Sequence, residues 1–265
     1  MRQRTRLAIL ECDTPLPETG KQYGGYGGVF KSLLDAGAKA EGYGGVDETL
    51  DISMHQIEAH PDDYPDINGV DALLLTGSSE SEGLSAGFVV LTYSEHDSFA
   101  DTPWINKLVE YTAHALESKR VRIIGVCFGH QIVARALGVK VGRNPDGWEA
   151  AVNDVQLTQK GKELFRLGRL RIHQMHRDIA FAYPDGFELL GSSPVCSVQG
   201  MFSPGHVITV QGHPEFTSKI MHEIVETRHA TGIFNDEAYK AHGKKIQLPH
   251  DGVAVSGAFV RFLLE

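Results

Sequence analysis

The chain has 265 residues, of which 42% are hydrophobic, and a formal net charge of −9 at pH 7. This length and apolar content are sufficient for a full hydrophobic core. The acidic charge argues against a general nucleic-acid binder, because the basic residues form no cluster beyond the dispersed Arg2, Arg4 and Arg6. We therefore expect no nucleic-acid partner.

The apolar runs and the cysteines exclude two further classes of protein. No run approaches the ~20 apolar residues of a membrane span, and residues 7–10 are too short for a signal-peptide core. Cys12, Cys127 and Cys196 are too few for a disulfide framework and lack the paired spacing of a zinc site. We expect a cytoplasmic protein with no membrane partner, no metal and no other cofactor.

The first half of the chain alternates strand and helix patterns. A strand at 7–12 is followed by a predicted loop at 13–28, and the later elements are helix 29–36, strands 52–57 and 71–76, helix 104–116, strand 121–126 and helix 130–137, which Gly138 ends. This order, with helices of crossover length, predicts a parallel sheet covered on both faces.

After Gly142 the pattern changes to short strand-like pieces separated by turn signals, at 150–157, 170–172, 187–190, 195–202 and 207–211. Thr217 is a good N-cap for a helix, and 253–264 can close the chain as an amphipathic helix. The sequence thus predicts an α/β fold in a single domain, 1–265, with an open, mostly parallel sheet, flanking helices and an antiparallel extension.

The pattern Gly125-x-Cys127-x-Gly129 lies where strand 121–126 meets the following helix. A strand-to-helix bend this sharp leaves no room for a Cβ on either side, so the glycines indicate a nucleophile elbow at the sheet edge. The helix N-terminus favours the thiolate, which is the attacking form of cysteine. A half-buried cysteine in a glycine-rich turn is the alternative, and this motif alone does not decide between them.

His213-Pro-Glu215 ends a strand and begins a helix, so in an open α/β sheet it reaches the same carboxyl edge as Cys127. Pro214 favours an extended His213, and a two-residue spacing in extended chain turns both side chains to one side. We predict a Cys127-His213-Glu215 relay, in which His213 transfers the proton and Glu215 fixes the imidazole tautomer. The chain has 13 histidines, and a lone His is more often a core or surface residue.

Acyl transfer also needs hydrogen-bond donors for an oxyanion. The strand that ends at Thr76-Gly77-Ser78 supplies a loop whose backbone can face the elbow. The backbone N–H groups of Gly77 and Phe128 are the candidate donors. A plain glycine turn after the strand is the alternative interpretation.

Together these residues resemble the class I glutamine amidotransferases, with Cys127, His213 and Glu215 in the positions of that family's catalytic triad. The stand-alone GMP-synthase-like branch, which includes plant γ-glutamyl peptidases and fungal relatives, is the most similar. The resemblance covers most of the chain and rests on the segments 125–131 (GVCFGHQ), 140–143 (KVGR), 176–178 (HRD) and 210–216 (VQGHPEF). It implies a flavodoxin-like fold and a small-molecule γ-glutamyl substrate, held by Gln131, Asp178 and His176.

Two segments are expected near the predicted site, and each has two possible roles. Residues from about 80 to 95 look inserted relative to the family, as a lid or an oligomer contact. The glycine-rich stretch 23–28 is expected to be a loop at the same edge, where it either accommodates a peptide or is plain surface.

Three functions stay open on the sequence. The first is a self-contained hydrolase of γ-glutamyl amides that proceeds through a thioester, and the second is a glutaminase subunit that passes ammonia to a separate synthetase. The third is a non-catalytic binding or stress-response relative on the same fold. The chain contains no P-loop for activating an acceptor, so we expect synthesis to need a separate partner enzyme.

Overall fold

The computed structural model describes residues 4–78 and 97–265. Within them a central sheet has seven strands in the order β2-β1-β3-β4-β12-β11-β9. Their bounds are Leu50–Gln56 (β2), Thr5–Glu11 (β1), Ala72–Leu75 (β3), Arg122–Val126 (β4), Val207–Val210 (β12), Met201–Ser203 (β11) and Glu188–Leu189 (β9). The first five strands are parallel, and β11 pairs antiparallel with both β12 and β9. The predicted mostly parallel sheet with an antiparallel extension is confirmed.

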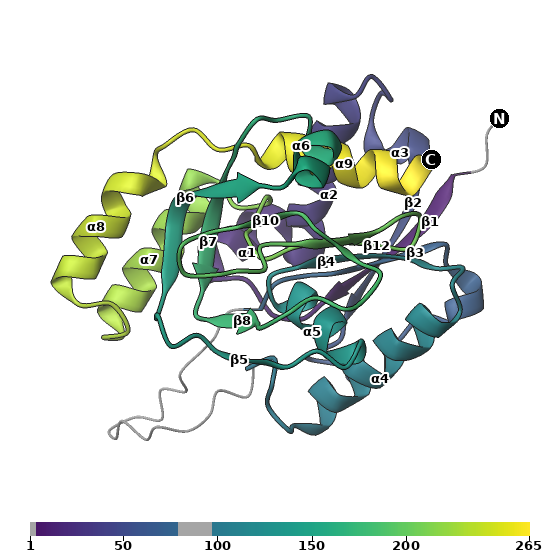
Figure 1. The fold of residues 1–265 in the computed structure, drawn as a ribbon, viewed down its shortest axis with the longest axis horizontal. Coiled ribbons are helices and arrows are strands. Elements are labelled where there is room, and N and C mark those ends of the chain that lie inside the picture. Colours follow the sequence, from purple (N-terminus) through teal and green to yellow (C-terminus); the bar gives the residue numbers. More distant parts are fainter. Residues whose placement is uncertain (1–3, 79–96) are drawn as a thin grey trace.

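Helices cover both faces of this sheet (Figure 1). One face packs against α2 and α9, and the other against α4 and α5. Their bounds are Tyr26–Ala40 (α2), Gly252–Leu264 (α9), Pro103–Glu117 (α4) and Phe128–Ala136 (α5). The sheet is thus the middle layer of three, as expected when parallel strands are joined by helical crossovers.

Strand β1 shows how the sequence specifies the two faces. Leu7 and Ile9 belong to the apolar cluster on the α2 and α9 side, whereas Ala8 and Leu10 belong to the cluster on the α4 and α5 side. All four are buried, because neighbouring side chains in a strand point to opposite faces and both faces are covered. Burial on both faces explains why the apolar run in β1 is continuous. A sheet with one face in solvent would alternate apolar and polar residues.

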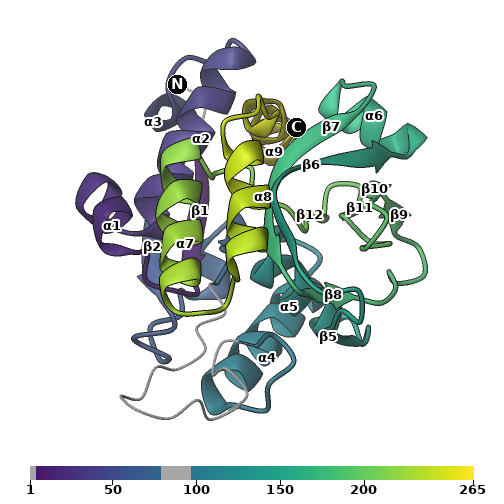
Figure 2. The same ribbon diagram turned by 90° about the vertical axis from the view of Figure 1, so that its left-hand side faces the viewer.

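A separate group of strands and helices lies beside this three-layer core (Figure 2). Strands β6 and β7 form a long antiparallel pair that β10 extends, and β5 pairs antiparallel with β8. Helices α7 and α8 pack beside this pair, with α8 against β6. The bounds are Val141–Arg143 (β5), Glu149–Leu157 (β6), Leu170–His176 (β7), Asp178–Ala180 (β8), Gly191–Ser192 (β10), Ser218–Ala230 (α7) and Asp236–Ile246 (α8).

Four short helical segments complete the described chain: Pro17–Tyr23 (α1), Val46–Thr49 (α3), Ile67–Gly69 (η1) and Gln159–Phe165 (α6). The prediction of a loop over residues 13–28 was wrong, since α1 lies within it and α2 begins at Tyr26. Pro17 at the first helical position and Gly24 at the C-cap (φ 82°) delimit α1, as their conformational preferences favour.

Other predicted elements differ in their bounds. Helix α5 begins directly after Cys127 rather than at residue 130, and Gly138 follows it with a φ of 79°. Of the predicted strand 195–202, residues from Met201 onward form β11. The stretch from about 80 to 95 lies outside the described residues. Across residues 4–78 and 97–265, no helix is long and apolar enough to cross a membrane.

Candidate active site

Cys127 stands at the bend between β4 and α5, in the geometry that the glycines predict. Its φ and ψ are 51° and −104°, values that a residue with a side chain adopts only when its surroundings hold it there. A Cβ on Gly129 would lie 2.3 Å from the carbonyl oxygen of Leu75, and one on Gly125 would lie 2.8 Å from that of Gly129. Gly129 is therefore required for the elbow to pack against β3, and Gly125 for the first turn of α5 to pack against β4.

Hydrogen bonds from two neighbouring strands hold the elbow in place. The Cys127 N–H donates to the Val210 carbonyl (2.9 Å), and the Gly129 N–H donates to the Thr76 carbonyl (3.1 Å). Cys127 is also the N-cap residue of α5, so the positive end of the helix dipole lies at the base of its side chain.

His213 and Glu215 form the pair that their spacing predicts. Nδ1 of His213 lies 2.7 Å from Oε1 of Glu215, and both residues are buried. The His213 N–H donates to the His173 carbonyl at 2.7 Å, and the Phe216 ring stacks on the imidazole with 4.0 Å between centroids. The His213 side chain is thus held by three contacts: a hydrogen bond of its backbone, the Phe216 ring on one face, and Glu215 at Nδ1.

The remaining nitrogen of His213, Nε2, is buried and is the ring nitrogen left for Cys127. Burial of the imidazole lowers its pKa, but the charges of Cys127 and Glu215, together with hydrogen bonding to both, outweigh this effect and raise the pKa of His213 to about 10. At neutral pH His213 is therefore an imidazolium, between Cys127 and Glu215.

The loop after β3 lies against this pair. A Cβ on Gly77 would come within 2.7 Å of Cε1 of His213 and 3.6 Å of Cβ of Cys127. Glycine is therefore needed for the backbone to approach the two side chains. Phe128 is the first residue of α5, and the N–H groups in a first helical turn have no partner within the helix. Gly77 and Phe128 thus flank Cys127, as an oxyanion site requires.

Gln131 and Asp178 are brought together by a hydrogen bond to the backbone. Nε2 of Gln131 donates to the Asp178 carbonyl (2.7 Å) and to Oε1 of Gln211 (3.1 Å). The Asp178 carboxylate is ion-paired with Arg143 at 3.0 Å, and Arg143 also pairs with the buried Asp97 at 2.8 Å. An acidic and an amide side chain therefore lie on the α5 side of Cys127.

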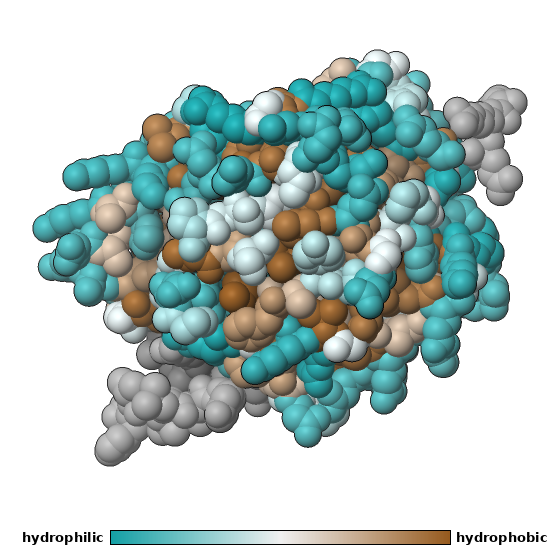
Figure 3. Space-filling view, viewed as in Figure 1, coloured by the Kyte–Doolittle hydropathy of each residue, from teal (hydrophilic) through white to brown (hydrophobic). Residues whose placement is uncertain are grey.

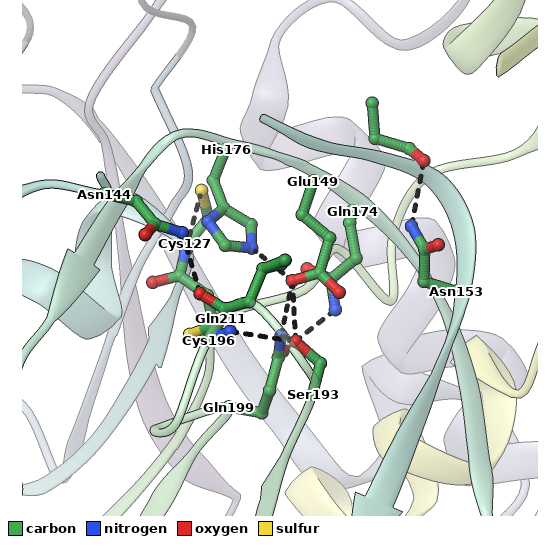
Figure 4. A network of polar contacts seen from close by, with 12 residues as sticks. Cys127, Asn144, Glu149, Asn153, Gln174, His176, Ser193, Cys196, Gln199 and Gln211 are labelled. Carbon is green, nitrogen blue, oxygen red and sulfur yellow. Dashed lines mark hydrogen bonds and ion pairs between the residues drawn. The ribbon is translucent and has the colours of Figure 1, made fainter. Parts of the chain in front are cut away.

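His176, the third candidate for substrate binding, is buried in a different set of contacts. Its Nδ1 lies 3.2 Å from the Asp178 carbonyl, and its Nε2 lies 3.2 Å from Oε2 of Glu149. The same carboxylate oxygen accepts from Ser193 (3.1 Å) and Gln199 (2.8 Å). Both ring nitrogens of His176 are thus engaged by the protein, and Figure 4 shows this polar network beside Cys127.

Sequence reasoning missed Gln211, whose Nε2 donates to Sγ of Cys127 at 3.5 Å. Gln211 precedes His213 by two residues at the end of β12, so period-two alternation is a signal that could have found it. Among residues 4–78 and 97–265, no group of three or more His, Cys, Asp or Glu side chains could hold a metal ion.

The fold and the site define a class of α/β protein with a cysteine elbow and a histidine–carboxylate pair at the carboxyl edge of the sheet. The chain belongs to the class I glutamine amidotransferase family, whose sequence model matches residues 97–230. It is similar to a glutamine amidotransferase-like protein of Schizosaccharomyces pombe, with 35% identity over 98% of both chains.

A second relative agrees with this membership, and a solved structure shares the fold. Gamma-glutamyl peptidase 3 of Arabidopsis thaliana is 30% identical over 85% of this chain and 82% of its own length. The crystal structure of a glutamine amidotransferase from Thermotoga maritima superposes with a TM-score of 0.64 at 16% identity, over the full length of both chains. The resemblance noted from the motifs is confirmed, and so is the fold class.

Proposed function

We propose that the protein is a cysteine-dependent hydrolase that cleaves the γ-glutamyl amide bond of glutamine or of γ-glutamyl peptides and glutathione conjugates. The observation that carries this proposal is the contact of one imidazole with both the elbow cysteine and Glu215. Gamma-glutamyl peptidases among the similar proteins support the substrate class.

The chemistry follows from the positions of the side chains. The Cys127 thiolate attacks the γ-carbonyl carbon, and the N–H groups of Gly77 and Phe128 stabilise the oxyanion. The tetrahedral intermediate collapses to a γ-glutamyl thioester as His213 protonates the leaving amine. His213 then removes a proton from water, which attacks the thioester and releases glutamate, and the departing Cys127 thiolate restores the pair with protonated His213. Glu215 holds the imidazole in one tautomer throughout.

We further propose that Gln131 and Asp178 bind the glutamyl head. The Gln131 amide nitrogen is engaged by two acceptors, so its Oε1 is the atom assigned to the substrate ammonium. For His176 we propose a positioning role, because both of its nitrogens already bind protein groups.

Glutamate release tests the proposal. Wild-type protein and Cys127→Ala are incubated with glutamine, γ-glutamyl-cysteine and a glutathione S-conjugate, and kcat/KM is measured for each. We expect cleavage of at least one substrate by the wild type and none by the variant. Full activity in Cys127→Ala would overturn the proposal.

A second candidate is a glutaminase subunit that delivers ammonia to a separate synthetase. The match to the glutamine amidotransferase family favours it. It predicts a strong preference for glutamine and stimulation by the partner enzyme, whereas the first candidate predicts that γ-glutamyl peptides are cleaved at least as well as glutamine. A non-catalytic relative would release no glutamate at all.

A further inference from the structure

A narrow pocket lies beside the catalytic histidine, on the side of Cys127 away from Gln131. Helices α2 and α7, strand β7 and the loop after β3 supply its walls, and the lining residues are Tyr26, Gly77, Ser78, Met175, His213, Phe216, Ile224 and Arg228. Gln131 and Asp178 belong to α5 and β8 and are not among them. In Figure 2 α2 and α7 lie at the left of the molecule, and α5 and β8 lie to their lower right.

The position of His213 in this wall decides what the pocket can receive. His213 protonates the amine that leaves, so the leaving group must lie against its ring when the γ-glutamyl bond breaks. The glutamyl head occupies the α5 side in the proposed reaction. The pocket is therefore on the path of the leaving group rather than of the glutamate.

Arg228 is the second cationic group in the wall of this pocket, beside His213. The residue is 5% exposed and lies beside the apolar cluster of α2, α7 and β7. Its guanidinium carbon lies 4.5 Å from the centroid of the Trp148 ring. Such stacking fixes the plane of the guanidinium, and its N–H donors lie in that plane, the geometry that recognises carboxylates.

The direction of the side chain fits this use. Arg228 lies in the last turn of α7, and helical side chains tilt towards the helix N-terminus, which for α7 is the end near His213. The pocket wall also contains Oγ of Ser78, which is buried without a hydrogen-bond partner among the described residues. Met175, Phe216 and Ile224 supply apolar surface between these polar groups.

We propose that this pocket is the leaving-group subsite and that Arg228 binds the terminal carboxylate of an amino acid or short peptide released from the γ-glutamyl group. The inference rests on the proposed hydrolase function and narrows its substrates to γ-glutamyl peptides with a free carboxylate. Ammonia, the leaving group of glutamine, carries no carboxylate and makes no such contact.

The test compares two substrates that differ only in this charge: γ-glutamyl-cysteinylglycine and its C-terminal amide. We expect the wild type to prefer the carboxylate by about 10- to 100-fold in kcat/KM, the usual range for a hydrogen bond to a charged group. In Arg228→Met this ratio falls to about one, and in Arg228→Lys, which keeps the charge but not the planar fork, it is intermediate.

Arg177→Met is the matched control. Arg177 also stacks on Trp148, at 5.3 Å, but does not line the pocket, so this variant should keep the preference for the carboxylate. A ratio near one in the wild type would overturn the inference, as would equal losses for the two substrates in Arg228→Met. If the wild type cleaves glutamine with no preference between the tripeptides, the subsite fails and the hydrolase stands. If it cleaves none of the three, the proposed function fails.

Discussion

Cys127 combines a strained backbone with a charged side-chain partner, and the two features depend on different residues. The strained bend depends on Gly129, which lets the elbow pack against β3, and on Gly125, which lets the first turn of α5 pack against β4. The electrostatic environment comes from His213, whose ring is fixed by Glu215 and Phe216. A substitution in the His-Glu pair should therefore affect the chemistry while leaving the bend intact.

This separation predicts a rank order of activity losses. We expect His213→Ala to lower kcat nearly as much as Cys127→Ala, because members of a relay act as a unit. The loss for Glu215→Gln should be about 10- to 100-fold smaller, since the carboxylate only orients the ring. Steady-state kinetics with the best substrate measure all three, and thermal unfolding confirms that each variant folds. If Glu215→Gln were silent, another group would have to orient His213.

The pKa of His213 provides a second prediction at this scale. Burial opposes protonation of the ring, while Cys127 and Glu215 raise its pKa to about 10. In Cys127→Ser the larger of these two charges is lost, so the ring should deprotonate at a distinctly lower pH. The ring titration of His213, followed by NMR in both proteins, measures the shift, and equal midpoints would contradict the assignment. His130, whose pKa burial lowers to about 3, serves as an internal reference.

The same pKa shift has a consequence for stability. The folded protein holds the His213 proton more tightly than an unfolded chain, in which the pKa is about 6.5. This contribution is complete below about pH 6.5 and is lost as the pH rises towards about 10. Urea unfolding at pH 6, 8 and 10 should therefore show a smaller decline for Cys127→Ser than for the wild type.

At the scale of elements, the loop after β3 is positioned by contact with the elbow and with His213. Gly77→Ala would place a Cβ 2.7 Å from Cε1 of His213, and a misplaced catalytic group can cost about 100-fold in rate. We expect kcat to fall by about that factor with the fold retained. Gly168→Ala is the control, because no atom lies within 4 Å of the added Cβ. Equal rates in the two variants would show that the loop tolerates the shift.

The parallel core and the triad could be predicted because their signals are local. Each central strand is a short apolar run, and the motifs around Cys127 and His213 sit at strand-to-helix junctions. Helices α1, α6 and α8 carry no such signal, since the residues buried in them are few: Thr19 in α1, Gly161 and Phe165 in α6, and Ile246 in α8. Strands β5 and β8 have three residues each, too few to show a period.

The parts of the site that could not be predicted depend on contacts between distant segments. Gln211 contacts Gln131 across 80 positions and Cys127 across 84. The two-residue spacing from His213 indicates the side to which Gln211 points, but it does not identify these distant partners. Arg228 lies on α7, whose apolar stripe is buried and consists of Ile220, Met221, Ile224 and Val225. Its burial against Trp148 follows from how α7 packs beside β6, which the spacing of residues does not show.

The surface of the whole molecule is mixed. Among residues 4–78 and 97–265, the exposed large apolar side chains come from several parts of the fold: Met54, Phe181, Tyr183, Leu248 and Val253. In Figure 3 brown and white atoms mingle over the middle of the face, and hydrophilic atoms surround much of its rim. Single exposed apolar side chains are ordinary on protein surfaces, so they do not by themselves define a docking site for a synthetase.

The distribution of the three cysteines over the fold predicts how the whole molecule reacts with electrophiles. Burial raises the pKa of Cys12 to about 12 and that of Cys196 to about 12, so at pH 7 about one molecule in 10⁵ carries either thiolate. Cys127 instead stands at a helix N-terminus beside His213.

A glutamine-like electrophile should therefore add mass to the folded protein at Cys127 alone, in step with the loss of turnover. After unfolding in urea, iodoacetamide should modify all three cysteines, because the difference in reactivity belongs to the fold and not to the residues. Peptide mapping by mass spectrometry locates each adduct. Labelling of Cys12 or Cys196 in the folded protein with undiminished glutamate release would show that the reactive thiol lies elsewhere in the molecule.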